Sequence, residues 1–145
     1  MEVELNMENH DGKCNCGNIE FSFEGDPINT VFCYCKECQS LTGSDKWFGL
    51  WVPKDKFRIT KGSPSIYTRI ADSGHEVHIN FCGNCGTTVC AEITVANFYS
   101  VPATALSKHS FTPNMSIYAA SAPKWAVFPK GIPKYDILPP GMGGT

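Results

Sequence analysis

The sequence predicts an all-β fold with little helix. Short runs rich in β-branched and aromatic residues recur along most of the chain, and turn residues separate them. Only one short segment has helical character, and proline is frequent after residue 107. With 145 residues, 42% of them hydrophobic, the chain is long enough for a real core, and we expect residues 1–145 to form a single domain.

The expected strands follow in order from the apolar runs and the turns that end them. An alternating run at 19–23 ends at the turn Glu24-Gly25-Asp26-Pro27, and Pro53 ends the third run. The predicted strands are 19–23, 30–34, 47–52, 57–60, 65–70, 76–81, 87–93 and 98–103. A helical turn is expected at 36–41, where Gly43 supplies the stop signal. Because proline cannot donate to a β-ladder, the segment after Ser107 is expected to be edge strand and loop around the core.

Charge and hydropathy exclude several classes of partner. The net charge of -2 gives no basic footprint for nucleic acid, and no apolar run approaches the ~18 residues of a membrane span. The first twelve residues are polar and acidic and lack the apolar region of a secretory signal. We therefore expect a cytoplasmic protein that acts on a small molecule, with neither a membrane nor a nucleic acid as partner.

The eight cysteines favour metal binding over disulfides. Disulfide frameworks belong mainly to small secreted chains, whereas tight cysteine clusters in a cytosolic chain indicate metal sites. The clusters are Cys14 with Cys16, then Cys33 with Cys35 and Cys38, then Cys82 with Cys85, while Cys90 stands alone. Cys90 lies in an apolar strand and is expected to be a small buried side chain.

The first and last pairs suggest a closed zinc site. Zinc prefers four tetrahedral ligands, and a short turn between two cysteines places two sulfurs on one side of the ion. Glycines beside Cys82 and Cys85 allow such a turn, and Cys14 with Cys16 can supply the second pair. A four-cysteine site of this kind would be structural and would clip distant parts of the chain together.

The middle cluster supplies only three ligands, from Cys33, Cys35 and Cys38, with no fourth at an obvious spacing. Three protein ligands and one open position are typical of catalytic zinc, which can hold a deprotonated thiol or water. Spacing alone leaves other divisions of the cysteines open. Cys90 or a histidine could complete this site, although ordinary strand or loop positions are the favoured interpretation for the three candidates, His75, His78 and His109.

The sequence resembles the glutathione-dependent formaldehyde-activating enzyme (GFA) family, also called the centromere protein V (CENP-V) domain family. The matching motifs are GKCNCG at 12–17, CYCKECQ at 33–39 with Thr42-Gly43, and FCGNCGT at 81–87. SAPKW at 121–125, GIP at 131–133 and Tyr135-Asp136 resemble the closing segment of the family. The resemblance covers about residues 10–136, the expected core of the domain.

The resemblance implies an Mss4-like β-tent, in which packed antiparallel sheets are organised around zinc. It implies a structural zinc on Cys14, Cys16, Cys82 and Cys85, and a catalytic zinc on Cys33, Cys35 and Cys38. The implied activity is that of a carbon-sulfur lyase, which adds glutathione as co-substrate to formaldehyde and gives S-hydroxymethylglutathione. Trp47, Phe48, Trp51 and Trp125 are candidates for an adjacent pocket, with a plain core role as the favoured interpretation.

A different class of function is the alternative: a non-catalytic binding module whose zinc is purely structural, like the β-tent proteins that bind small GTPases. An exposed apolar patch, and a protein side chain in the fourth position of the Cys33 cluster, would favour that alternative. A chromatin or cytoskeletal role, suggested by the centromere protein name, would be expected to need a basic extension, which this sequence lacks.

Overall fold

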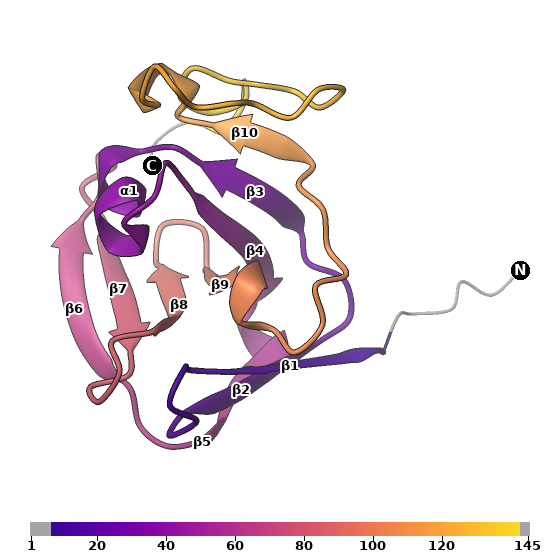
Figure 1. The fold of residues 1–145 in the computed structure, drawn as a ribbon, viewed down its shortest axis with the longest axis vertical. Helices are drawn as coiled ribbons and strands as arrows, with labels where there is room; N and C mark the ends of the chain where they lie inside the picture. The colour runs from indigo at the N-terminus through magenta and orange to yellow at the C-terminus, as the bar shows by residue number, and fades with distance from the viewer. Residues whose placement is uncertain (1–6, 143–145) are drawn as a thin grey trace, which may run out of the picture.

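The computed structural model describes residues 7–142 and contains two β-sheets (Figure 1). The smaller, three-stranded sheet has the order β1-β2-β5, formed by β1 (Asn9–Lys13), β2 (Glu20–Glu24) and β5 (Phe57–Lys61). The larger, seven-stranded sheet has the order β10-β3-β4-β9-β8-β7-β6. Its strands are β10 (Met115–Ile117), β3 (Asn29–Cys33), β4 (Trp47–Pro53), β9 (Phe98–Pro102), β8 (Thr88–Ile93), β7 (Glu76–Phe81) and β6 (Ser65–Ile70).

The larger sheet curls so that its two ends approach each other. In Figure 1, β6 and β7 form one side of the curl, β3 and β10 form the other, and α1 (Lys36–Thr42) lies between the two ends. Neighbouring strands are antiparallel throughout, except that β10 runs parallel to β3. The short 3-10 turns η1 (Lys54–Lys56), η2 (Ala103–Ala105) and η3 (Ala119–Ser121) complete the elements. No helix of the described chain is both long and apolar enough to cross a membrane.

The main core lies between the two sheets. Phe21 and Phe23 of β2 and Phe57 of β5 pack with Leu50 of β4 and Val101 of β9, and all five side chains are buried. Because side chains alternate across a strand, the other face of β4 and β9 points away from this core, into the concave side of the larger sheet. That concave face carries the candidate site.

The segment after residue 121 wraps the outer edge of the larger sheet, as the proline pattern predicted. The Tyr118 amide donates to the carbonyl of Ile137, and the Tyr135 amide donates to the carbonyl of Ser116 in β10. These contacts hold the C-terminal segment over β10 and β3, where it closes one side of the concave face.

The eight predicted strands and the predicted helix are present, and no end differs from its predicted position by more than one residue. Gly43 ends α1 in the left-handed conformation, with φ of 67°, as a glycine stop signal requires. Two strands had not been predicted. β1 has a polar sequence with one buried position, Gly12, and β10 has only three residues, so neither carries a recognisable apolar alternation.

Candidate metal centres and cavity

The first cysteine cluster joins two turns that are distant in the sequence. The sulfurs of Cys14, Cys16, Cys82 and Cys85 all lie within 4.8 Å of one another. The Sγ atoms of Cys14 and Cys16 are 3.6 Å apart, and those of Cys16 and Cys82 are 3.7 Å apart. Four thiolates placed tetrahedrally at about 2.3 Å from zinc have sulfurs roughly 3.8 Å apart, so the donor set fits a closed zinc site. Disulfide sulfurs would be about 2.05 Å apart, and all eight cysteines are free.

The two turns that present these sulfurs have matching geometry. The amide of Gly17 donates to the carbonyl of Cys14, and the amide of Gly86 donates to the carbonyl of Cys82. Both glycines have φ of 80°, a left-handed conformation that few other residues adopt without strain. The Asn15 amide also donates to Thr87 Oγ1 at 3.1 Å, which ties one turn to the other.

The second cluster is formed where β3 runs into α1. Cys33 ends β3, Cys35 caps the N-terminus of α1, and Cys38 lies in the first helical turn. The amide of Cys38 donates to the Sγ atom of Cys35 at 3.4 Å, which fixes the cap. The three sulfurs lie within 4.8 Å of one another, and among residues 7–142 no histidine, carboxylate or fourth cysteine joins them.

The local electrostatics of this cluster suit a divalent cation. Hydrogen bonds from Cys33 and Cys38 lower the pKa of the Cys35 thiol to about 3. The hydrogen bond to Cys35 in turn raises the pKa of Cys33 to about 12, and hydrogen bonds to Cys33 and Cys35 raise that of Cys38. The three groups thus share protons around one thiolate, whereas a bound zinc ion would deprotonate all three. The residues present fit a three-thiolate metal site.

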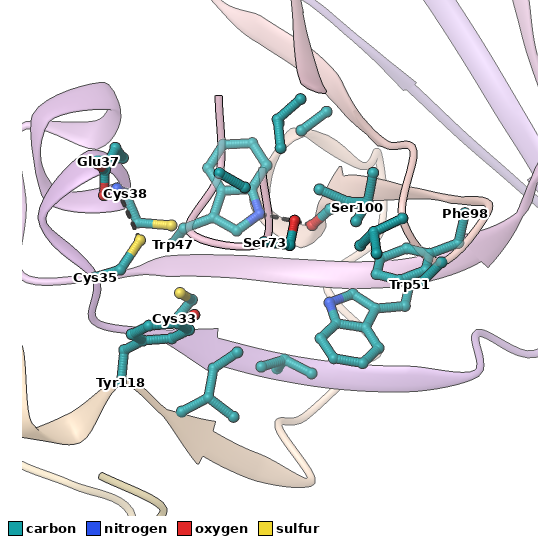
Figure 2. A pocket seen from close by; sticks show the side chains of 18 of the residues that line it. Cys33, Cys35, Glu37, Cys38, Trp47, Trp51, Ser73, Phe98, Ser100 and Tyr118 are labelled. Atoms are coloured by element: carbon teal, nitrogen blue, oxygen red, sulfur yellow. Dashed lines mark hydrogen bonds between the residues drawn. The ribbon is translucent and has the colours of Figure 1, made fainter. Parts of the chain in front are cut away.

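A cavity of about 410 Å³ opens beside the second cluster (Figure 2). The sulfurs of Cys33, Cys35 and Cys38 form one end, and Trp51 and Phe98 lie further along (Figure 2). Its floor is the concave face of the larger sheet, which contributes mostly apolar side chains, namely Val31, Val77, Ile79, Ala91 and Ile93. Tyr118, Leu138 and Met142 add a wall from the segment that follows β10.

Trp47 connects the cluster to the floor of the cavity. Its side chain is buried against Cys35 and Cys38, and its Nε1 donates to Ser100 Oγ at 2.9 Å. The indole therefore lies across β4 toward β9 with its polar atom satisfied. Gly49 makes this arrangement possible, because a Cβ atom there would lie 2.5 Å from Trp47 Nε1 and would collide with Ser100 Oγ.

The four aromatic residues proposed as pocket candidates lie in different environments in the structure. Trp47 and Trp51 line the cavity, which was the candidate role, whereas Phe48 takes the favoured core role and Trp125 takes neither. Phe48 packs toward the core between the sheets because alternation turns it to the other face of β4, and Trp125 is exposed on the surface.

Cys90 is buried in the main core, where desolvation raises the pKa of its thiol to about 12. This position confirms the prediction of a small buried side chain. None of the candidate histidines enters a cysteine cluster. His75 lines the cavity, His78 hydrogen-bonds Thr68, and His109 contacts the carbonyl of Thr104.

Among the lining residues that sequence reasoning missed are Glu37, Arg69, Ser100 and Tyr118. Glu37 lies within the CYCKECQ motif at 33–39, so its charged side chain beside the cysteines could have marked it as a candidate. The other three come from strands and loops whose pairing the sequence does not reveal.

The fold is all-β and carries two cysteine clusters that could each hold a metal ion. One cluster is closed by four cysteines, and the other has three cysteines beside an apolar cavity. These features define the class: a β-protein with one closed and one open cysteine metal site. The chain belongs to the family described as glutathione-dependent formaldehyde-activating enzyme, whose model matches residues 9–121. The predicted Mss4-like architecture of sheets around cysteine clusters is confirmed.

A crystal structure of a Rhodobacter sphaeroides protein is similar in fold. Its TM-score is 0.56 at 19% sequence identity, over 71% of this chain and 91% of that chain. Among curated proteins, none matches the sequence. The family model therefore shows the family, and the solved structure supports the fold alone.

Proposed function

We propose that the chain is a zinc-dependent carbon-sulfur lyase that joins a small thiol, glutathione or a similar one, to formaldehyde or another carbonyl compound. The single observation that carries this proposal is the position of Cys33, Cys35 and Cys38. Their sulfurs meet at the wall of a substrate-sized cavity, and no fourth ligand joins them within the described chain. Membership of the family supports the same reaction.

The charge of the site favours thiol chemistry. Three thiolates around Zn²⁺ leave a net charge of about −1, which weakens Lewis acidity and makes such a zinc better suited to hold an exchangeable thiolate than to polarise water strongly. When bound, the zinc supplies this stabilisation of a substrate thiolate. The sulfur then attacks the carbonyl carbon, a C–S bond forms, the C=O π bond breaks, and the carbonyl oxygen takes up a proton equivalent to the one the thiol lost. Thiol and aldehyde together give a hemithioacetal, which for formaldehyde is an S-hydroxymethyl adduct, and the reverse reaction breaks the same C–S bond.

Each cysteine cluster is assigned its own metal role. We propose that Cys14, Cys16, Cys82 and Cys85 hold a structural zinc and that Cys33, Cys35 and Cys38 hold the catalytic one. Trp47 and Tyr118 pack against the second cluster. We further propose that residues 1–145 form one domain and that the protein acts in the cytoplasm.

The alternative, a binding module, has one observation in its favour. The edge strand β6 exposes Ile66, Tyr67 and Ile70, each with more than half of its surface accessible. An apolar edge of this kind can serve as a protein contact. The lyase proposal is preferred because no described side chain fills the fourth position of the Cys33 cluster.

A cobalt-substituted protein tests the proposal directly. Cobalt-thiolate charge-transfer absorption grows with each added sulfur, so glutathione should raise it in the wild type. Cys35→Ser should abolish the response, while Cys90→Ala, a cysteine outside both clusters, should keep it. In parallel, the exchange rate between ¹³C-formaldehyde and its glutathione adduct should rise with the zinc protein. Absence of both effects at millimolar glutathione would remove the glutathione assignment, and the binding module would then be preferred.

A further inference from the structure

Arg69 occupies an unusual position in the cavity wall. It lies on β6, paired with Val77 of β7, and its side chain lines both the main cavity and a smaller hollow against α1. Its Nε atom is buried without a hydrogen-bond partner. Nor is any side-chain hydrogen bond or ion pair of Arg69 found within residues 7–142, although Glu37 lines the same hollow.

A buried guanidinium N–H without a partner is costly unless something binds to it, and in Arg69 this holds for Nε, although the residue as a whole is half-buried. Burying a charged donor without a partner costs free energy, and Arg carries several N–H donors in a planar fork that matches a carboxylate. The rest of the chain does not supply that carboxylate among the described residues. A ligand that enters the cavity can supply it.

The charged side chains that line the cavity favour binding of an anion at Arg69. Arg69 is the only lysine or arginine among the described lining residues, whereas Glu37, Asp72 and Glu76 are acidic. A zinc held by three thiolates would add further negative charge at the cysteine end. Among the Asp, Glu, Lys and Arg side chains of this lining, the acidic ones would repel a substrate carboxylate and Arg69 would attract it.

Arg69 also lies close to the proposed reaction centre. Arg69 lines the same cavity as Cys33, Cys35 and Cys38, and it also lines the hollow against α1, the helix that Cys35 caps. A small molecule that places its sulfur at the cluster can therefore place a second group at the guanidinium within the same cavity.

We propose that Arg69 binds the carboxylate of the substrate, so that the site selects thiols that carry a carboxylate over neutral thiols. The inference rests on the proposed function, because it assumes that the thiol sulfur binds at Cys33, Cys35 and Cys38. It narrows the substrate to acidic thiols, a class that includes amino-acid and peptide thiols, and makes Arg69 a specificity-determining residue.

The test compares pairs of thiols on the cobalt-substituted protein. Mercaptoacids with one, two and three methylene groups are titrated against the mercaptoalcohols of equal length, with charge-transfer absorption as the readout. The wild type should bind at least one acid about tenfold to a hundredfold more tightly than its alcohol, the range expected for a charge-assisted hydrogen-bond pair. Equal affinity throughout the series in the wild type would overturn the proposal without any variant.

Variants then assign the preference to the residue. Arg69→Gln should remove the preference and leave alcohol binding unchanged, and Arg69→Lys should keep part of it. Arg58→Gln is the matched control, because Arg58 is exposed and pairs with Glu24 on the smaller sheet. If Arg69→Gln weakens acids and alcohols equally, the residue is merely structural and the proposal falls. If no thiol perturbs the wild-type spectrum, the proposed function fails and the inference fails with it.

Discussion

Trp47 and Ser100 are joined by a hydrogen bond of 2.9 Å from the indole Nε1 to the hydroxyl Oγ, both groups buried on the concave face of the larger sheet. The bond crosses from β4 to β9 and fixes the indole beside Cys35 and Cys38. The cysteine end of the cavity therefore owes its shape to a contact between residues from different strands.

Ser100→Ala should destabilise the protein. The substitution leaves the buried indole N–H of Trp47 without a partner, which costs about 1–3 kcal/mol. Urea denaturation of the zinc-loaded protein measures the loss. Ser107→Ala is the control, because Ser107 makes an exposed hydrogen bond to Asp11 and should cost little. If both substitutions lower the free energy of unfolding equally, the hydrogen bond to Trp47 contributes no more to stability than an exposed one.

Gly49→Ala should be harmful for a steric reason. The added Cβ would lie 2.5 Å from Trp47 Nε1 and would collide with Ser100 Oγ, so the indole must leave its position. Overpacking of this kind costs about 1–3 kcal/mol. We expect a lower melting temperature and an altered tryptophan fluorescence spectrum. An unchanged spectrum with unchanged stability would mean that the indole does not lie across Gly49.

Metal analysis should find about two zinc ions per chain. The prediction follows from two separate groups of thiols, one of four and one of three. Protein purified without chelator is assayed by elemental analysis, with free thiols counted after denaturation. One zinc per chain would argue against the Cys33 site, and stoichiometric disulfides would contradict the free cysteines seen in the structure.

The two clusters should differ in their contribution to folding. Cys82→Ser removes a ligand from the closed site that joins distant turns, and metal binding there is coupled to folding. That variant should be insoluble or melt far below the wild type. Cys35→Ser should remain folded and lose mainly the metal of the open cluster. Similar thermal melts for the two variants would contradict the division into structural and catalytic sites.

Cys90 should resist alkylation in the native protein at neutral pH. Its pKa is raised to about 12 by burial, so the reactive thiolate, which forms only as pH rises toward that value, is almost absent at pH 7. Iodoacetamide treatment followed by peptide mass mapping should show labelling of Cys90 only after denaturation. Rapid labelling in the native state would mean that this part of the core opens easily.

The sequence by itself determined the fold class and the candidate ligands. Apolar runs between turns mark the strands because a strand must bury one face, and the cysteine spacings mark the metal clusters because short turns place sulfurs side by side. Such signals lie within short stretches of sequence, so they can be recognised without knowledge of the fold. β1 was not predicted because it is polar and its side chains show no apolar alternation. It joins the sheet through backbone pairing with β2, and the sequence of β1 carries no signal for that pairing.

Only the tertiary structure decided what surrounds the open cluster. Whether an aromatic of β4 faces the cavity or the core depends on which side of the sheet is concave, and this separates Trp47 from Phe48. Arg69 stands 31 or more positions from the cysteines of the open cluster and reaches them only because the larger sheet curls and brings β6 next to α1. Contacts of this kind arise from strand order and curvature, which are set by the packing of the whole chain and by no single stretch of sequence.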